Sequence, residues 1–258
     1  MRLVTTELRA IINHVVGRYS LFEDCSAEQK QEINRIIALR KTGMPLAKII
    51  GYKEFWKNHF FTTQDTLDPR PDSETMIEAV LNCIKEETFS ILDLGTGTGC
   101  LLLSLLQEYP KAKGVGVDIS SKALAVAQSN IDQLGIKAQL VESNWCEALT
   151  GGSFDIIISN PPYIEKHESI NLDATFDPPV ALYGDLNTYE TILKSIDTYL
   201  QKKPEYIFFE VGYDQADQVA NLLEHFGYAS VRFHLDLAGI KRVVSAKSIT
   251  PNKIIGRE

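Results

Sequence analysis

Residues 91–100 have the sequence Ile91-Leu92-Asp93-Leu94-Gly95-Thr96-Gly97-Thr98-Gly99-Cys100. The apolar residues before Gly95 predict a buried strand, and those after Gly99 predict a helix. The glycines between these elements permit a tight turn and let a ligand approach the backbone closely. A dinucleotide-binding loop that began at Gly95 would have glycine or alanine in place of Cys100, so we expect a different nucleoside at this turn. The carboxyl group of Asp93 favours a cationic group over a pyrophosphate.

Strands and helices alternate from residue 89 onward. The predicted strands are Phe89–Leu94, Lys113–Val117, Ala138–Glu142, Phe154–Ser159, Tyr206–Val211, Ser230–Leu235 and Lys241–Ala246. The predicted helices are Gly99–Tyr109, Ser121–Leu134, Leu186–Leu200 and Gln215–Phe226. This alternation indicates an α/β domain, residues 66–258, with a parallel sheet and helices on both of its faces.

The preceding residues have a different pattern. Residues 1–65 lack the alternation and predict a small helical domain that ends in a hairpin or extended linker, Tyr52–Thr63. Within it, Ser26-Ala27-Glu28-Gln29 has the spacing of a capping box at the start of a helix. We expect the aromatic residues of the linker to pack between the two domains. Beyond the linker, Asp72 or Ser73 is predicted to cap another helix.

Composition and charge exclude several classes of protein. A hydrophobic content of 44% and a charged content of 23% are ordinary for a soluble globular protein. The sequence has no apolar run of membrane-spanning length and no signal-peptide core, so we expect a cytoplasmic protein without a membrane partner. The four cysteines and five histidines lack the spacing of metal ligands, and we expect no metal. A net charge of −8 argues against a stable nucleic-acid partner.

Polar and aromatic residues follow the second and third predicted strands. Asp118 ends the second strand, where a carboxylate can accept hydrogen bonds from both ribose hydroxyls. Asn144 and Trp145 follow the third strand and supply an amide and an indole ring that could bracket an adenine. Alternatively, Asp118 caps the next helix and Trp145 is a packed core aromatic. The occurrence of all three at successive strand ends favours a nucleoside site.

The fourth predicted strand ends at Asn160-Pro161-Pro162-Tyr163. Prolines cannot continue a sheet ladder, so the chain leaves the sheet here. The Asn160 side chain offers an acceptor oxygen, and the fixed backbone of Pro161 presents a carbonyl as a second acceptor. Two acceptors at a fixed spacing suit a planar NH2 group, and the ring of Tyr163 can stack on the group that carries it. The four residues therefore predict a site that orients a weakly nucleophilic amine.

Together these features resemble class I S-adenosylmethionine-dependent methyltransferases, and among them the release-factor glutamine methyltransferases. The motifs that carry the resemblance are Pro45-Leu46-Ala47, Gly51-Tyr52-Lys53-Glu54-Phe55-Trp56, Pro69-Arg70-Pro71-Asp72-Ser73-Glu74, Asp93 to Gly99, Asn160 to Tyr163 and Asp236-Leu237-Ala238-Gly239. The resemblance implies a Rossmann-like sheet of seven strands with an antiparallel strand near its edge, and a helical N-terminal domain that holds the release factor. The implied reaction methylates N5 of the glutamine in the Gly-Gly-Gln motif and leaves S-adenosylhomocysteine.

The resemblance also implies roles for individual residues. The implied cofactor-binding residues are Asp93, Gly95, Thr96, Gly97, Thr98, Gly99, Asp118, Asn144, Trp145 and Asn160. The implied substrate-binding residues are Asn160, Pro161, Pro162 and Tyr163, and of these Asn160, Pro161 and Tyr163 are expected to be catalytic. Asn144 stands where this family usually has an acid before tryptophan.

Two other functions fit part of this pattern. A nucleic-acid amino methyltransferase acting on adenine N6 or guanine N2 would use Asn160 to Tyr163 in the same way, because its acceptor is also a planar NH2 group. A non-catalytic S-adenosylmethionine-binding module would need no such residues. The acidic charge and the motifs between residues 45 and 56 favour the release-factor enzyme.

Overall fold

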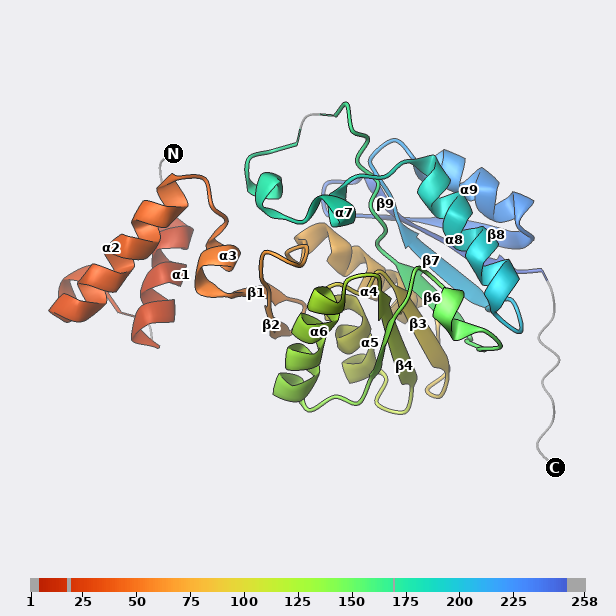
Figure 1. Cartoon of the computed structure of the whole chain (residues 1–258), viewed down its shortest axis with the longest axis horizontal. Helices are drawn as coiled ribbons and strands as arrows, with labels where there is room; N and C mark the ends of the chain where they lie inside the picture. The colour runs from red at the N-terminus through yellow and green to blue at the C-terminus, as the bar shows by residue number, and fades with distance from the viewer. Residues whose placement is uncertain (1–4, 18–19, 169, 250–258) are drawn as a thin grey trace.

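The computed structural model describes residues 5–17, 20–168 and 170–249 (Figure 1). Its helices are α1 (Thr5–Val16), α2 (Ala27–Lys41), α3 (Leu46–Ile50), α4 (Glu74–Cys83), α5 (Cys100–Glu108), α6 (Ser121–Leu134), α7 (Pro179–Leu182), α8 (Leu186–Tyr199) and α9 (Ala216–His225). Its strands are β1 (Tyr52–Phe55), β2 (Asn58–Phe61), β3 (Ser90–Leu94), β4 (Lys113–Asp118), β5 (Gln139–Glu142), β6 (Ile156–Ser159), β7 (Tyr206–Glu210), β8 (Tyr228–Leu235) and β9 (Lys241–Ser248).

The large sheet has seven strands in the order β5-β4-β3-β6-β7-β9-β8. The strands from β5 to β7 are parallel, and β9 runs antiparallel to both of its neighbours, β7 and β8. The order reverses between β3 and β6, and such switch points are where open α/β sheets bind ligands. The predicted fold class, including an antiparallel strand near the edge, is confirmed.

Helices cover both faces of this sheet because its central strands are apolar on both sides. Along β6, Ile156 and Ile158 pack in a core with α4, α5 and α6, whereas Ile157 packs in a second core with α8 and α9. Successive side chains of a strand point to opposite faces, so the unbroken apolar run of β6 serves both cores. The site-bearing strand is thereby fixed from two sides.

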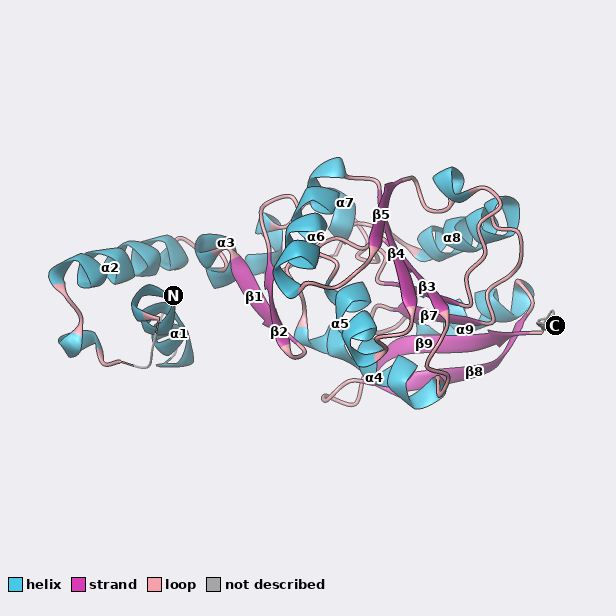
Figure 2. Cartoon of the chain, turned by 90° about the horizontal axis from the view of Figure 1, so that it is seen from below, coloured by secondary structure: helices cyan, strands magenta, loops and turns pink. Residues whose placement is uncertain are grey.

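The N-terminal helices have a small core of their own, built around Ile11, Ile33 and Ile36. The capping box that starts α2 is present as predicted. Figure 2 shows the β1–β2 hairpin between these helices and the large sheet. Phe55 and Phe60 of the hairpin are 1% and 0% exposed and belong to the core that contains α4 and α5. These two linker aromatics therefore pack within the sheet domain and not between the two domains, and Phe61 is 42% exposed.

A cluster of buried charges fastens the N-terminal helices to the sheet domain. Asp177 accepts hydrogen bonds from the backbone N–H of Asp68 at 3.2 Å and from the Arg70 guanidinium. Lys48 of α3 lies 3.0 Å from Asp177 and 2.8 Å from Asp68. The side chains of all three residues are at most 6% exposed. We call Lys48, Asp68, Arg70 and Asp177 the Asp177 cluster.

The predicted side-chain cap of α4 is wrong. Ser73 occupies the N-cap position but makes no capping hydrogen bond, because the preceding 3₁₀ turn, Pro71–Ser73, leads directly into the helix. The hydroxyl of Ser73 contacts another part of the chain instead, as described below. Across the residues that the structure describes, no helix combines the length and apolar character needed to cross a membrane.

Candidate active site

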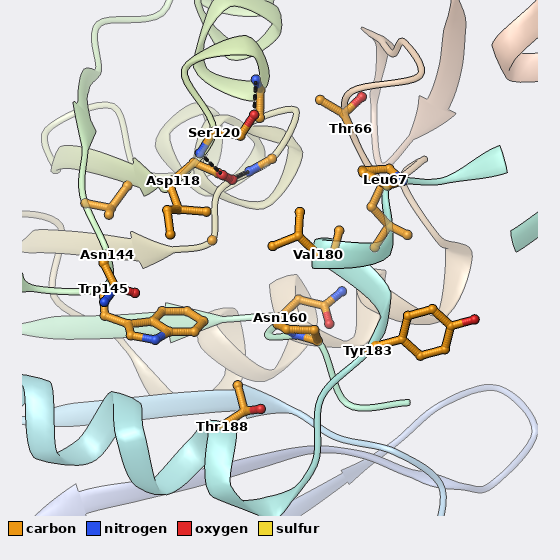
Figure 3. Close-up of a pocket in the computed structure, with 18 of the residues that line it drawn as sticks. Thr66, Leu67, Asp118, Ser120, Asn144, Trp145, Asn160, Val180, Tyr183 and Thr188 are labelled. Atoms are coloured by element: carbon orange, nitrogen blue, oxygen red, sulfur yellow. Dashed lines mark hydrogen bonds between the residues drawn. The ribbon is translucent and has the colours of Figure 1, made fainter. Parts of the chain in front are cut away.

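A cavity of about 440 Å³ lies at the carboxyl ends of the central strands (Figure 3). The residues that follow β3, β4, β5 and β6 all contribute to its wall. They include the following members of the predicted site: Gly95, Gly97, Asp118, Asn144, Trp145, Asn160 and Pro162. The structure therefore brings part of the predicted nucleoside site and part of the predicted amine site into one cavity.

The glycine loop is held against the neighbouring strand by its backbone. The N–H groups of Gly95 and Thr96 both donate to the carbonyl of Val117 at 2.8 Å. Gly95 and Gly97 have φ values of 77° and 55°, a region that side chains disfavour. A Cβ atom added at Gly97 would meet no other protein atom within 4 Å, so this part of the loop borders open space that a ligand can enter.

Asp118 stands at the end of β4 and holds the loop in place. Its Oδ2 accepts the Gly97 N–H and its Oδ1 accepts the Ser120 N–H, both at 2.9 Å. Each carboxylate oxygen has two lone pairs, so both oxygens can accept a further bond from a ligand. The cap of α6 is the side chain of Ser120, which accepts from the N–H of Ala123, and the alternative role of Asp118 as that cap is wrong. Burial raises the pKa of Asp118, and its bonds to Ser120 and Gly97 oppose that rise.

Trp145 projects its ring into the cavity, as Figure 3 shows. Its φ is 50°, a left-handed conformation that is uncommon for a bulky residue and that recurs at functional sites. A Cβ atom at Gly95 would lie 3.9 Å from the indole ring, so the ring and the glycine loop border the same space. The neighbouring Asn144 is exposed and donates to Glu147 at 2.7 Å.

Asn160 follows β6, and in Figure 3 it lies between Trp145 and Tyr183. Its Nδ2 donates to the hydroxyl of Ser73 at 3.3 Å. Because the amide nitrogen is engaged there, the carbonyl oxygen Oδ1 is the part of Asn160 that can accept a bond from a ligand. Pro162 also lines the cavity, whereas Pro161 is buried and is not among the lining residues.

These features can be compared with known proteins. The family model of the methyltransferase small domain matches residues 70–176. The chain is 37% identical over 255 residues to the release factor glutamine methyltransferase of Rhodospirillum rubrum, an alignment that covers 93% of this chain and 78% of the relative. It is 40% identical over 219 residues to the release factor glutamine methyltransferase of Cereibacter sphaeroides, covering 82% and 77%. The chain belongs to the release factor glutamine methyltransferase family.

Solved methyltransferases share the fold. The hMettl16 catalytic domain in complex with MAT2A 3'UTR hairpin 1 gives a TM-score of 0.59 at 16% identity, and the match covers 96% of this chain and 89% of that one. At this level of identity the likeness concerns the fold alone. This chain therefore has the same fold as that solved methyltransferase.

Not all predicted site residues of this family member line the cavity. Thr96, Thr98 and Gly99 lie within the loop and are buried. Asp93 lies behind the loop and is 1% exposed, with Oδ2 accepting the Thr96 hydroxyl at 2.7 Å and Oδ1 lacking a hydrogen-bond partner among the described residues. The pKa of Asp93 is raised to about 7, mainly by burial; the nearby Asp118 charge contributes to the rise and the Thr96 bond opposes it.

Tyr163 turns away from this cavity. Its hydroxyl donates to Glu210 Oε1 at 3.3 Å, and its ring borders a second cavity of about 260 Å³. Its backbone carbonyl accepts from Gln215 at 3.0 Å, and Gly184 packs so closely that a Cβ atom there would lie 2.0 Å from the carbonyl oxygen of Pro162. In this structure Tyr163 therefore fixes the turn rather than lining the cofactor side of the site.

Sequence reasoning missed several residues of this release factor glutamine methyltransferase site. Further parts of the cavity wall come from residues just after the linker (Asp65, Thr66, Leu67) and from the segment around α7 (Pro178, Val180, Ala181, Tyr183). Asn130 of α6 is 0% exposed and joins the glycine loop to β2 through Thr98 and Phe61. A polar residue on the apolar face of a predicted helix was the available signal for Asn130.

Proposed function

We propose that this protein transfers a methyl group from S-adenosylmethionine to the side-chain amide nitrogen of the glutamine in the Gly-Gly-Gln motif of peptide chain release factors. The observation that carries the proposal is Asn160, whose amide is held by Ser73 so that Oδ1 can accept a bond in the cavity that Asp118 and Trp145 also line. An acceptor for a planar NH2 group and a nucleoside pocket thus share one space.

The residues present fit S-adenosylmethionine. The side-chain-free loop at Gly95 and Gly97 leaves room for the methionine part, and Asp118 would accept the ribose hydroxyls. The indole of Trp145 offers an apolar surface for the adenine. The carboxyl group of Asp93, whose Oδ1 is unpartnered, lies behind the loop, and its ionisation above about pH 7 would favour a cationic ligand there.

The bound cofactor would supply a methyl group already activated by its sulfonium. The protein then has to hold the acceptor amide in the correct orientation, which by itself lowers a reaction barrier. Asn160 Oδ1 and the carbonyl of Pro161 would accept the two N–H bonds of the amide and favour the positive charge that develops on its nitrogen. In this scheme Tyr163 keeps the turn in place through Glu210.

Charge supports a protein acceptor over a nucleic acid. Among the described residues that line the cavity there are three aspartates, Asp65, Asp118 and Asp185, and no lysine or arginine. Enzymes that bind nucleic acid normally present basic side chains to the phosphates. The names of the relatives also favour a release factor, and no observation favours adenine or guanine as the acceptor.

The helical N-terminal domain, residues 1–65, would provide the docking surface for the release factor. A single glutamine side chain offers little surface for selection, and α1 to α3 form a core of their own, which Figure 1 shows apart from the sheet domain. Because β1 and β2 pack in the core of the sheet domain and Lys48 of α3 belongs to the Asp177 cluster, a deletion that tests docking should end at Thr42 and keep α3 and the hairpin. The deletion should preserve cofactor binding and greatly reduce methylation of full-length release factor. A cytoplasmic location remains a prediction from the sequence.

The experiment that tests the function is a methylation assay with labelled S-adenosylmethionine and a panel of acceptors. Full-length release factor, total RNA and duplex DNA would be offered separately. We expect label on the release factor alone. Label on RNA or DNA with none on the release factor would overturn the proposal, and binding of cofactor without any transfer would indicate a non-catalytic module.

A further inference from the structure

A buried carboxylate lies directly behind the acceptor turn. Glu210 ends β7, the neighbour of β6 in the sheet, and is 1% exposed. Its Oε1 accepts the hydroxyl of Tyr163, whereas its Oε2 makes no hydrogen bond within the described part of the chain. A buried carboxylate oxygen without a donor is costly, so its retention at this place calls for a functional explanation.

Ser73 connects this carboxylate to Asn160. It is 3% exposed, and its oxygen accepts the Asn160 amide N–H at 3.3 Å. A hydroxyl that accepts one bond still has its own proton to donate. Burial raises the pKa of Glu210 to about 7, and the adjacent Ser73 hydroxyl acts in the opposite direction by favouring the ionised form. Because Ser73 bonds Asn160 and Glu210 bonds Tyr163 of the same turn, the Ser73 hydroxyl is the candidate donor for the unpartnered oxygen.

We propose that Glu210 and Ser73 are positioning residues that set which end of the Asn160 amide faces the acceptor glutamine. With its proton directed to Glu210, Ser73 can only accept from Asn160, so Asn160 must turn Nδ2 toward Ser73 and Oδ1 toward the cavity. An Asn160 turned the other way would present an NH2 group to the NH2 group of the substrate, and two donors cannot bond. This inference rests on the proposed function and adds how the orientation of the Asn160 amide toward the substrate is fixed.

The groups around Glu210 allow its ionisation to be followed. The titratable or charged side chains that face it are Tyr163, Tyr189, Cys100, Arg242 and Asp72. Burial raises the pKa values of both tyrosines and of Cys100, so these groups do not titrate near pH 7. Asp93, beyond this group, titrates in the same range as Glu210. The contribution of Glu210 to the pH dependence of kcat is therefore obtained only by comparing the wild-type profile with that of a Glu210 variant.

The first test is a set of serine and asparagine variants assayed on full-length release factor. Ser73→Ala should lower kcat by about three- to tenfold, the worth of one hydrogen bond, with the cofactor Kd unchanged. Ser104→Ala is the matched control, because Ser104 is also buried and its hydroxyl has no hydrogen-bond partner among the described residues. The double variant Ser73→Ala/Asn160→Ala should be no slower than Asn160→Ala alone, because Ser73 acts through Asn160.

The second test is the pH dependence of kcat in Glu210→Gln, which preserves shape. Wild-type kcat should fall as pH decreases through about 7, because a protonated Glu210 no longer receives the Ser73 proton. Glu210→Gln should be about three- to tenfold slower at pH 8.5 and should lack the Glu210 part of the pH dependence. Circular dichroism of each variant checks that it is folded.

Either of two results with the serine variants would overturn the positioning role of Ser73 and Glu210. The first is a wild-type kcat in Ser73→Ala. The second is a double variant Ser73→Ala/Asn160→Ala that is slower than Asn160→Ala by the same factor by which Ser73→Ala is slower than wild type. A pH profile of kcat in Glu210→Gln that runs parallel to the wild-type profile would also overturn it. If wild type itself does not methylate the release factor, the proposed function fails instead, and the two failures are distinguishable.

Discussion

The two halves of the cavity are built in different ways. The cofactor half consists of backbone and strand ends, as in the bonds from Gly95 and Gly97 to β4, which follows β3 in the sequence. The acceptor half depends on side chains from distant segments, because Asn160 is held by Ser73, 87 residues earlier, and its outer wall is fixed by the Asp177 cluster. On the proposed function, cofactor binding would depend on neighbouring strand ends, whereas acceptor recognition would depend on contacts between segments far apart in the sequence.

The largest effect of a single substitution is expected at the Asp177 cluster, where segments far apart in the sequence meet. Asp177→Asn should lower the free energy of unfolding by about 3 kcal/mol, because Arg70 loses its carboxylate partner and Lys48 keeps only Asp68 as a buried counter-charge. Chemical denaturation measures this change. Glu87→Gln is the control, since the exposed Glu87–Lys111 pair should contribute under about 1 kcal/mol. Equal effects of the two substitutions would mean that the Asp177 cluster does not hold the acceptor half together.

Removing the hydrogen-bond acceptor Asn160 should lower turnover much more than it weakens cofactor binding. Asn160→Ala should lower kcat on release factor by about 100-fold, the scale for loss of one preorganised group that stabilises developing charge. The cofactor Kd should change much less, because the glycine loop and Asp118 are untouched. Steady-state kinetics and calorimetry on the same preparation measure the two quantities. A wild-type kcat in Asn160→Ala would show that Asn160 does not orient the methyl-accepting amide.

The opposite pattern is expected in the cofactor half. Asp118→Ala should weaken S-adenosylmethionine binding by about 2 kcal/mol, through loss of a charge-assisted bond to ribose. At saturating cofactor, KM for the release factor should stay near its wild-type value. Titration calorimetry provides the Kd, and an unchanged Kd in a folded variant would contradict the ribose assignment.

The smallest effect is expected at Asn144. Its side chain is exposed and bonds to Glu147, which is also exposed. Asn144→Ala should therefore change the cofactor Kd by only about 0.5 kcal/mol. A loss as large as that of Asp118→Ala, measured in the same titration, would show that the Asn144 amide contacts the adenine directly.

The same division explains what could be predicted from the sequence. The glycine loop, Asp118 and Trp145 follow strands whose apolar runs are visible in the sequence, and parallel strands must end at one edge of a sheet. Ser73, Glu210 and Asp177 carry no such signal, because their partners are known only once β6, β7 and the linker are packed. Ser73 was predicted to cap a helix, a local role, and instead binds Asn160.

Tyr163 shows the limit of a motif read alone. Its place after Asn160 and two prolines indicates that the turn serves an amine, but not where the ring points. The ring direction follows from the buried carboxylate of Glu210, 47 residues later, which accepts the Tyr163 hydroxyl. Stacking of Tyr163 on the substrate amide stays a prediction, and a structure with a glutamine peptide would test it.

The central claim is that the cavity methylates a glutamine amide in a protein. The most direct measurement is peptide mapping by mass spectrometry of a full-length release factor after incubation with this protein and S-adenosylmethionine. The account predicts one added methyl group, on the glutamine of the Gly-Gly-Gln motif, which is absent when Asn160→Ala replaces the wild type. A methyl group on any other residue, or none on the release factor while RNA or DNA becomes methylated, would contradict it.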